Sequence, residues 1–124
     1  MRSVRLLLAL VLVTGVLVAG SPAVSAGDPY RTWAACSHSK DAPASHECDR
    51  NDEKAAFFRS RSADVTYKVC VKFPNDQKLC ASHQNAPEDR TKRNVITSTM
   101  VGRHVITWIV AGEQVGRFRM DVTN

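Results

Sequence analysis

The chain has 124 residues, with 17 Lys or Arg against 12 Asp or Glu, and a formal net charge of +5. Arg2 and Arg5 supply two of these positive charges, so residues 27–124 carry 15 basic and 12 acidic side chains, a net charge of +3. This mild excess argues against a nucleic-acid partner, which requires basic residues clustered on one face. The 98 residues after position 26 can form one domain and leave no room for a second core.

Residues 1–26 have the three parts of a secretory signal peptide. Arg2 and Arg5 form a positive start, residues 6–18 form an apolar run, and small residues at 24–26 offer a cleavage site. The apolar run of 13 residues is shorter than the roughly 18 that a membrane-spanning helix needs. We therefore expect a secreted, extracellular protein with no membrane span after cleavage. An uncleaved anchor is the alternative.

Four cysteines follow the predicted signal peptide, at Cys36, Cys48, Cys70 and Cys80. An even number of cysteines in a small exported domain indicates two disulfides, for which three connectivities exist. The local pairs Cys36–Cys48 and Cys70–Cys80 are favoured because both close short rings. A ring of this size stabilises the fold by roughly 2.5–3 kcal/mol.

Residues 64–80 predict a β-hairpin around which the rest of the domain is organised. Alternate residues in its first half are apolar, which is the period of a half-buried strand. These residues are Val65, Tyr67, Val69, Val71 and Phe73. Pro-Asn-Asp at 74–76 then favours a chain reversal.

The register of this hairpin follows from its turn. A reversal centred on Asn75 places Cys70 opposite Cys80 and Val71 opposite Leu79, and a one-residue slip would break both matches. The apolar residues should then face a second sheet, while the disulfide lies on the outer face. Three lysines would lie beside it there, at Lys68, Lys72 and Lys78.

The other segments are predicted with less regular patterns. Residues 27–54 form an irregular segment closed by the first disulfide. Residues 55–61, with two adjacent aromatics, favour a strand over the end of a short helix. Residues 83–94 are polar and predict an exposed connection, and the β-branched run at 95–101 predicts a strand.

A second hairpin is predicted at 104–110 and 115–122. A three-residue loop at 112–114 places Trp108 opposite Phe118 and keeps the apolar face continuous. A two-residue loop at 112–113 would place Trp108 opposite Arg117 instead.

Five to seven short strands without helical periodicity predict an all-β fold. Two hairpins with apolar faces are best buried against each other, so the fold class is an immunoglobulin-like antiparallel β-sandwich over residues 55–124 with two local disulfides. The aromatic and Met side chains on the inferred buried faces should form the core. They are Tyr67, Phe73, Trp108, Phe118 and Met120, whereas Tyr30 and Trp33 lie outside the predicted strands.

The run GRHVITWIVAGEQVGRFRMDV at 102–122, with AFF at 56–58 and the 64–80 hairpin, resembles small exported immunoglobulin-like proteins of actinobacteria with no established activity. The resemblance covers residues 55–122. It implies the fold and export, and it transfers no catalytic residues. A looser similarity to the enediyne-carrier chromoproteins depends on one cysteine spacing within a hairpin.

The pattern Cys36-x-His38 and His46-x-Cys48 contains two thiols and two imidazoles, a competent set of zinc ligands. An oxidising environment favours the disulfide, and the spacing is too tight for the usual zinc motifs. We therefore expect a disulfide and no resident metal. Loose binding of a metal by His38 and His46 beside the disulfide is the open alternative.

No catalytic constellation is evident in the sequence. There is no G-x-S-x-G motif, and Ser82 and His83 are neighbours at a strand end that point to opposite faces. His83 and His104 are interpreted as exposed strand-end residues. We therefore expect neither enzymatic activity nor a cofactor.

Two classes of function fit this pattern. The first is a non-catalytic, monomeric extracellular module that binds an extracellular protein or an envelope polymer. The second is a secreted inhibitor or effector that presents the braced loop at 36–48 to an extracellular enzyme. Six basic residues either form a patch for an anionic surface or are a solubilising surface. They are Arg90, Lys92, Arg93, Arg103, Arg117 and Arg119.

Overall fold

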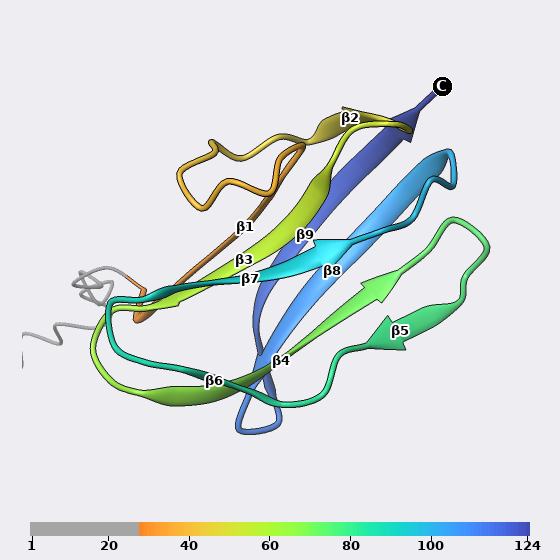
Figure 1. Ribbon diagram of the computed structural model, residues 1–124. Helices are drawn as coiled ribbons and strands as arrows, with labels where there is room; N and C mark the ends of the chain where they lie inside the picture. Colours follow the sequence, from red (N-terminus) through yellow and green to blue (C-terminus); the bar gives the residue numbers. More distant parts are fainter. Residues whose placement is uncertain (1–27) are drawn as a thin grey trace, which may run out of the picture.

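A computed structural model describes residues 28–124, so the predicted signal peptide at 1–26 lies outside the described residues. Within this part of the chain, nine strands form two facing sheets (Figure 1). The three-stranded sheet has the order β1 (Tyr30–Ala35), β3 (Lys54–Ser60), β7 (Thr91–Ile96). The six-stranded sheet has the order β2 (Glu47–Asp49), β9 (Glu113–Thr123), β8 (Gly102–Val110), β4 (Val65–Lys72), β5 (Lys78–Cys80), with β6 (Gln84–Ala86) also beside β4.

The predicted sandwich with two local disulfides is confirmed. All strand pairs are antiparallel except β2 with β9, which is parallel. The core lies between the sheets, where Phe58 of β3 stacks on Tyr67 of β4 with ring centroids 4.2 Å apart. No helix among the described residues is long and apolar enough to cross a membrane.

The register of the first hairpin is also confirmed. Cys70 lies opposite Cys80 and Val71 opposite Leu79, and Cys70 and Cys80 are joined by a disulfide with a Cα–Cα distance of 4.0 Å. Leu79 departs from expectation, because 66% of its surface is exposed although it shares the inner face with Val71. No strand of the other sheet covers β5, the shortest part of this hairpin.

The predicted register of the second hairpin is wrong by two residues. Its turn contains only Ala111 and Gly112, both with positive φ (51° and 79°), as in the two-residue turns that match strand twist. A bulge after Gln114 then shifts the register and places Trp108 opposite Gly116. Side chains alternate between the two faces of a sheet, so a register error of two residues leaves every side chain on its predicted face. The apolar face is therefore still the buried one, and Trp108 is fully buried.

Three other predicted segments differ from the structure. The segment at 27–54 contains two strands, since β1 pairs with β3 and β2 pairs with β9. The connection at 83–94 contains β6 and the start of β7. The strand expected at 95–101 instead begins at Thr91 and ends at Ile96. The prediction missed its start because β7 is an edge strand, and its polar first half obscures the apolar alternation.

Gly116 of β9 allows β1 of the opposite sheet to pack closely against it. A Cβ atom added there would lie 2.8 Å from the Cβ of Thr32 on β1, closer than real Cβ atoms approach one another. We expect Gly116→Ala to lower the free energy of unfolding in urea by about 1–3 kcal/mol. Adding Thr32→Gly should recover part of that loss, and a purely additive double variant would contradict this account.

Candidate functional site

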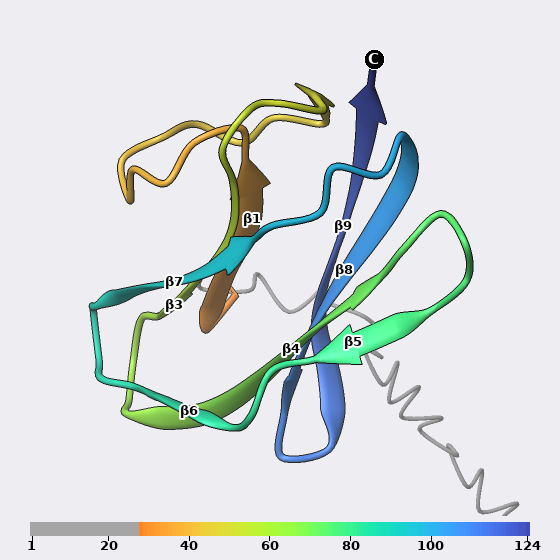
Figure 2. The same ribbon diagram turned by 45° about the vertical axis from the view of Figure 1, so that its right-hand side comes forward.

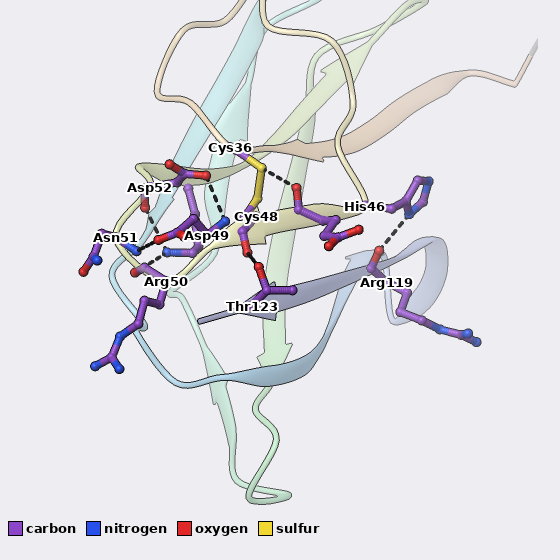
Figure 3. The surroundings of a disulfide bond; sticks show 11 residues. Cys36, His46, Cys48, Asp49, Arg50, Asn51, Asp52, Arg119 and Thr123 are labelled. Carbon is purple, nitrogen blue, oxygen red and sulfur yellow. Dashed lines mark hydrogen bonds between the residues drawn. A yellow bond between two sulfur atoms is a disulfide. The ribbon is translucent and has the colours of Figure 1, made fainter.

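The first candidate is the loop at 36–48, which begins at the end of β1 and ends in β2. Cys36 and Cys48 form a disulfide with a Cα–Cα distance of 5.5 Å, as predicted (Figure 3). Cys48 lies in β2 beside Val122 of β9, and the Thr123 hydroxyl donates a hydrogen bond to the Cys48 carbonyl at 3.3 Å. Because β1 and β2 belong to different sheets, this disulfide joins the two sheets at one end of the sandwich.

The same loop covers an aromatic pair on the outer face of the three-stranded sheet. Trp33 and Phe57 lie opposite each other on β1 and β3, and their rings stack 5.1 Å apart. Neighbouring strand residues point to opposite faces, and Phe58 points inward to Tyr67, so this pair points outward. Trp33 is nevertheless only 4% exposed, and its position in β1 corrects the expectation that it lies outside the strands.

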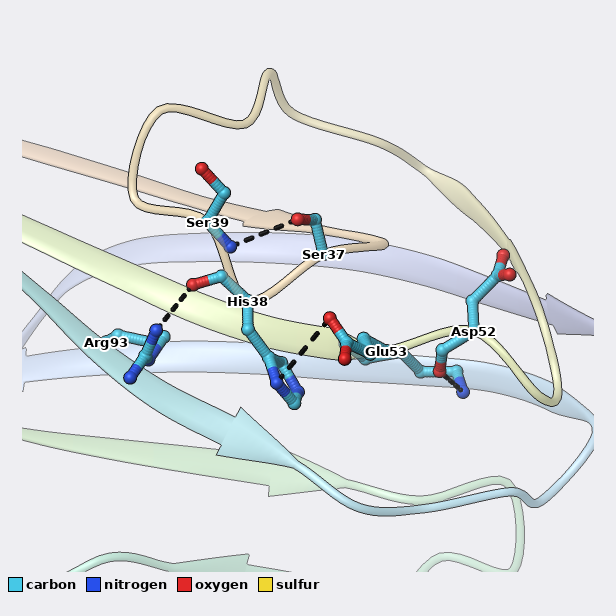
Figure 4. A network of polar contacts seen from close by, with 7 residues as sticks. Ser37, His38, Ser39, Asp52, Glu53 and Arg93 are labelled. Atoms are coloured by element: carbon cyan, nitrogen blue, oxygen red, sulfur yellow. Dashed lines mark hydrogen bonds and ion pairs between the residues drawn. The ribbon is translucent and has the colours of Figure 1, made fainter.

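Three backbone groups hold the loop over this pair. The indole N–H of Trp33 donates to the Ala42 carbonyl at 3.2 Å, and the Ser45 amide donates to the Ala34 carbonyl at 2.9 Å. The Arg93 guanidinium of β7 donates to the His38 carbonyl at 2.7 Å (Figure 4). The loop is thus fastened to both edge strands of the three-stranded sheet.

The two histidines of this loop lie in different surroundings. His38 Nδ1 lies 3.7 Å from a Glu53 carboxylate oxygen (Figure 4). His46 stacks on Phe118 at 4.1 Å, and its Nδ1–H donates to the Arg119 carbonyl at 2.7 Å (Figure 3). The disulfide removes the thiolates that the zinc alternative requires, and residues 28–124 contain no group of three or more His, Cys, Asp or Glu placed to hold a metal.

The second candidate is a groove of about 730 Å³ between the two sheets. One wall is the β4–β5 hairpin and the other is β7 with the connection that follows it. The apolar side chains that define it are Val69, Val71, Phe73, Leu79, Ile96 and Met100. Its polar lining consists of hydroxyl and amide side chains, and none of the lining residues is charged.

The groove exists because the sheets have unequal widths. β1 packs over β9 and β3 over β4, while β5 has no strand across from it (Figure 2). Immunoglobulin constant-type domains place strands A, B, E and D in one sheet. Here β1, β3 and β7 have the order of A, B and E, and β5 instead extends the opposite sheet. The position of strand D is therefore vacant beside β7.

A buried histidine lies behind the groove wall, in contact with Ser98, which lines the groove. The Ser98 hydroxyl lies 2.9 Å from His104 Nε2, and His104 Nδ1–H donates to the Gly102 carbonyl at 3.1 Å, which leaves Nε2 as the acceptor. His104 is 1% exposed, so its interpretation as an exposed residue is wrong. Sequence reasoning missed this pair because the fold of residues 97–101 creates it.

The surroundings of His104 disfavour its charged form. Burial lowers the pKa of His104 from 6.5, and the charge of Lys54 lowers it further, against the opposing effects of the Gly102 hydrogen bond and Asp121. A general base must become imidazolium, and here a neutral carbonyl occupies the position of an orienting carboxylate. The pair is thus a poor nucleophile–base arrangement.

Comparisons with known proteins concern the fold alone. No protein-family model and no curated protein sequence matches the chain. Among solved structures it is similar to an immunoglobulin-like protein from Pseudomonas aeruginosa, with a TM-score of 0.50 and 10% identity over 78% of this chain and 94% of that one. It also matches a Pseudomonas fluorescens alkylpurine DNA glycosylase with a TM-score of 0.44 and 10% identity, over 79% of this chain and 31% of that one.

The first of these similarities supports the immunoglobulin-like fold. The second is too weak to support any argument. The resemblance to exported actinobacterial proteins stays a prediction.

The covering role of the loop predicts a change in tryptophan exposure. The chain has two tryptophans, and both are buried. We expect the double variant Cys36→Ser/Cys48→Ser to lose about 3 kcal/mol of unfolding free energy and to expose Trp33 to acrylamide quenching. The matched control Cys70→Ser/Cys80→Ser should lose a similar free energy without added quenching. Equal quenching in the two variants would show that the first disulfide does not hold the cover.

The lowered pKa of His104 predicts acid sensitivity. The unfolded chain binds a proton at His104 at higher pH than the folded chain, so stability is complete above about pH 6.5 and falls below it, by at most about 1.4 kcal/mol per pH unit. Urea unfolding at pH 7.5 and 5.5 measures the loss. His104→Asn should show a smaller loss, and an equal loss would assign the effect to other groups.

Proposed function

We propose that the protein is a secreted, non-catalytic binding module that takes an extended peptide segment of an extracellular protein into the groove. The vacant strand position beside β7 is the observation that carries this proposal. Two disulfides indicate an oxidising compartment, which supports the export predicted from residues 1–26.

A bound strand would extend the three-stranded sheet and cover the inner face of β5. β7 is an edge strand, so alternate residues present backbone N–H and C=O groups that pair with no strand on that side. A peptide paired there adds a strand, as in other cases of strand addition. Its inward side chains would face β5 and cover Leu79, whose surface is two-thirds exposed.

The groove lining defines the chemistry of the peptide. Burying a charged side chain against apolar surface without a partner is costly, and the lining supplies no charged partner. The ligand should therefore be uncharged over the buried stretch and alternate apolar with small polar residues. Hydroxyl and amide groups of Thr97, Thr99 and Gln77 can satisfy its polar atoms.

A non-catalytic role agrees with the chemistry of the Ser98–His104 pair, whose serine lines the groove. Its histidine resists protonation, so the serine hydroxyl lacks an effective base. The pair serves instead to satisfy a buried imidazole and to hold the connection after β7.

The inhibitor hypothesis is the second candidate. The loop at 36–48 is held rigidly, and its tip at Ser39, Lys40 and Asp41 is exposed, as a braced inhibitory loop would be. The same hydrogen bonds keep the loop over Trp33 and Phe57. This covering role explains the rigidity of the loop without a target enzyme. The groove has no such structural explanation and is preferred as the binding site.

Synthetic peptides of about seven residues that alternate valine with threonine test the proposal. On titration, we expect the backbone amide NMR signals of Leu79 and Val95 to shift. Leu79→Lys should weaken binding by roughly tenfold, because an apolar contact is lost.

Two controls make the test specific. Val101→Lys alters an equally apolar exposed residue outside the groove lining and should leave binding unchanged. A peptide with every second amide N-methylated cannot pair with β7 and should not bind. Binding that survives N-methylation and Leu79→Lys contradicts the proposal, and so does the absence of binding by the whole peptide set.

A further inference from the structure

The outer face of the six-stranded sheet carries a second surface, independent of the groove. Alternation along each strand places six basic side chains there, from β4, β5, β8 and β9. We call this set the cationic face. Its members are Lys68, Lys72, Lys78, Arg103, Arg117 and Arg119.

This face differs from the patch suggested by the sequence. Lys92 and Arg93 lie on β7 in the other sheet, and Arg90 lies in the turn before it. The three lysines of the first hairpin replace them, since Lys72 lies opposite Lys78 on the same face as Arg119.

The whole excess of positive charge in the described chain lies on this face. Residues 28–124 contain 15 basic and 12 acidic side chains. The face has six of the basic ones and three of the acidic ones, Glu47, Asp49 and Asp121, so nine of each sign remain elsewhere and cancel. The domain is therefore polarised, with its net charge of +3 on one sheet surface.

The acidic residues gather at one corner of the face. Glu47 and Asp49 lie on β2, and Asp121 lies beside them on β9, 3.6 Å from Arg103. The turn residue Asp76 lies 3.6 Å from Lys72, but both side chains are more than half exposed, so solvent weakens this pair. Lys78, Arg117 and Arg119 are exposed.

The arrangement of the charges favours a linear partner. Val105, Thr107 and Ile109 of β8 form a neutral, half-buried strip between the basic residues of β4 and β9. Strands lie about 4.8 Å apart, so the two basic rows are about 10 Å apart, within reach of long side chains that clasp one chain between them. A polymer lying along β8 would contact both rows.

The chemistry of the face favours an anionic polymer over a protein. Protein interfaces have cores enriched in aromatic residues and depleted of charge. Among the side chains that the strand registers place on this face, none is aromatic. Arginine binds phosphate through paired N–H groups, and lysine adds a point charge.

We infer that the cationic face binds a linear phosphodiester polymer of the cell envelope, which lies along β8 and is held from both sides by β4 and β9. The polymer is recognised through its regular negative charge, so the affinity depends on salt. The groove faces the interior of the sandwich, so this surface and the peptide site can be tested separately.

Synthetic poly(glycerol phosphate) is a suitable probe. With about five phosphate contacts, its affinity should fall roughly a hundredfold from about 50 to about 200 mM salt, on the scale seen for flexible polyanions. Arg117→Gln/Arg119→Gln should weaken binding by about tenfold or more and reduce the salt dependence. The second variant Lys72→Gln/Lys78→Gln should do the same from the other row.

The control variant Arg61→Gln/Arg90→Gln removes the same charge from exposed positions outside the face and should change the affinity less than about twofold. Thermal unfolding confirms that each variant is folded. Equal weakening by the control would show that net charge alone is responsible and would overturn the inference. Binding to anionic phospholipid vesicles or to single-stranded DNA without binding to the polymer would overturn it as well.

Discussion

The unequal width of the two sheets is the constraint from which the surface features of this protein follow. A three-stranded sheet cannot cover the inner face of a sheet with six strands. The core is complete where β1 and β3 lie over β9, β8 and β4, and it is open beneath β5. Apolar side chains that a fourth strand would bury, above all Leu79, are left facing a groove.

Stability must then come from features other than sheet coverage. The Cys36–Cys48 disulfide joins the sheets at one end, and the loop that it closes adds a second, smaller apolar layer outside Trp33 and Phe57. The Tyr67 hydroxyl lies within hydrogen-bonding distance of Asn94 and Gln84, which ties β4 to β7 across the core. Burial also raises the pKa of Tyr67 to about 12, so the hydroxyl stays protonated at physiological pH and these hydrogen bonds persist.

Local patterns predicted those parts of the fold that depend on local register. The first hairpin was predictable because Cys70, Cys80 and the apolar alternation all require one register. The second hairpin has no disulfide that fixes its register. Counting residues outward from the turn cannot reveal the bulge that shifts it. The cover over Trp33 and the Ser98–His104 contact depend on how loops fold onto sheets, for which the sequence has no periodic signal.

The candidate sites were less predictable than the fold for the same reason. The groove results from a strand that joins one sheet instead of the other, a choice that leaves the alternation in β5 unchanged. The cationic face required knowing which strands are neighbours, because Lys72 and Arg119 are distant in sequence and meet across β8. The sequence supplied the charges, and topology decided which of them lie together.

The β4–β5 hairpin links the two surfaces proposed for binding. Its odd-numbered residues, such as Val71 and Leu79, line the groove, while Lys72 and Lys78 lie on the opposite face. A slip of one residue between these strands would place lysine in the neutral groove and leucine on the cationic face. The Cys70–Cys80 disulfide forbids that slip, since its sulfur atoms meet in a single register. This bridge therefore does more than stabilise the fold, because it keeps two chemically different surfaces on opposite sides of one short hairpin.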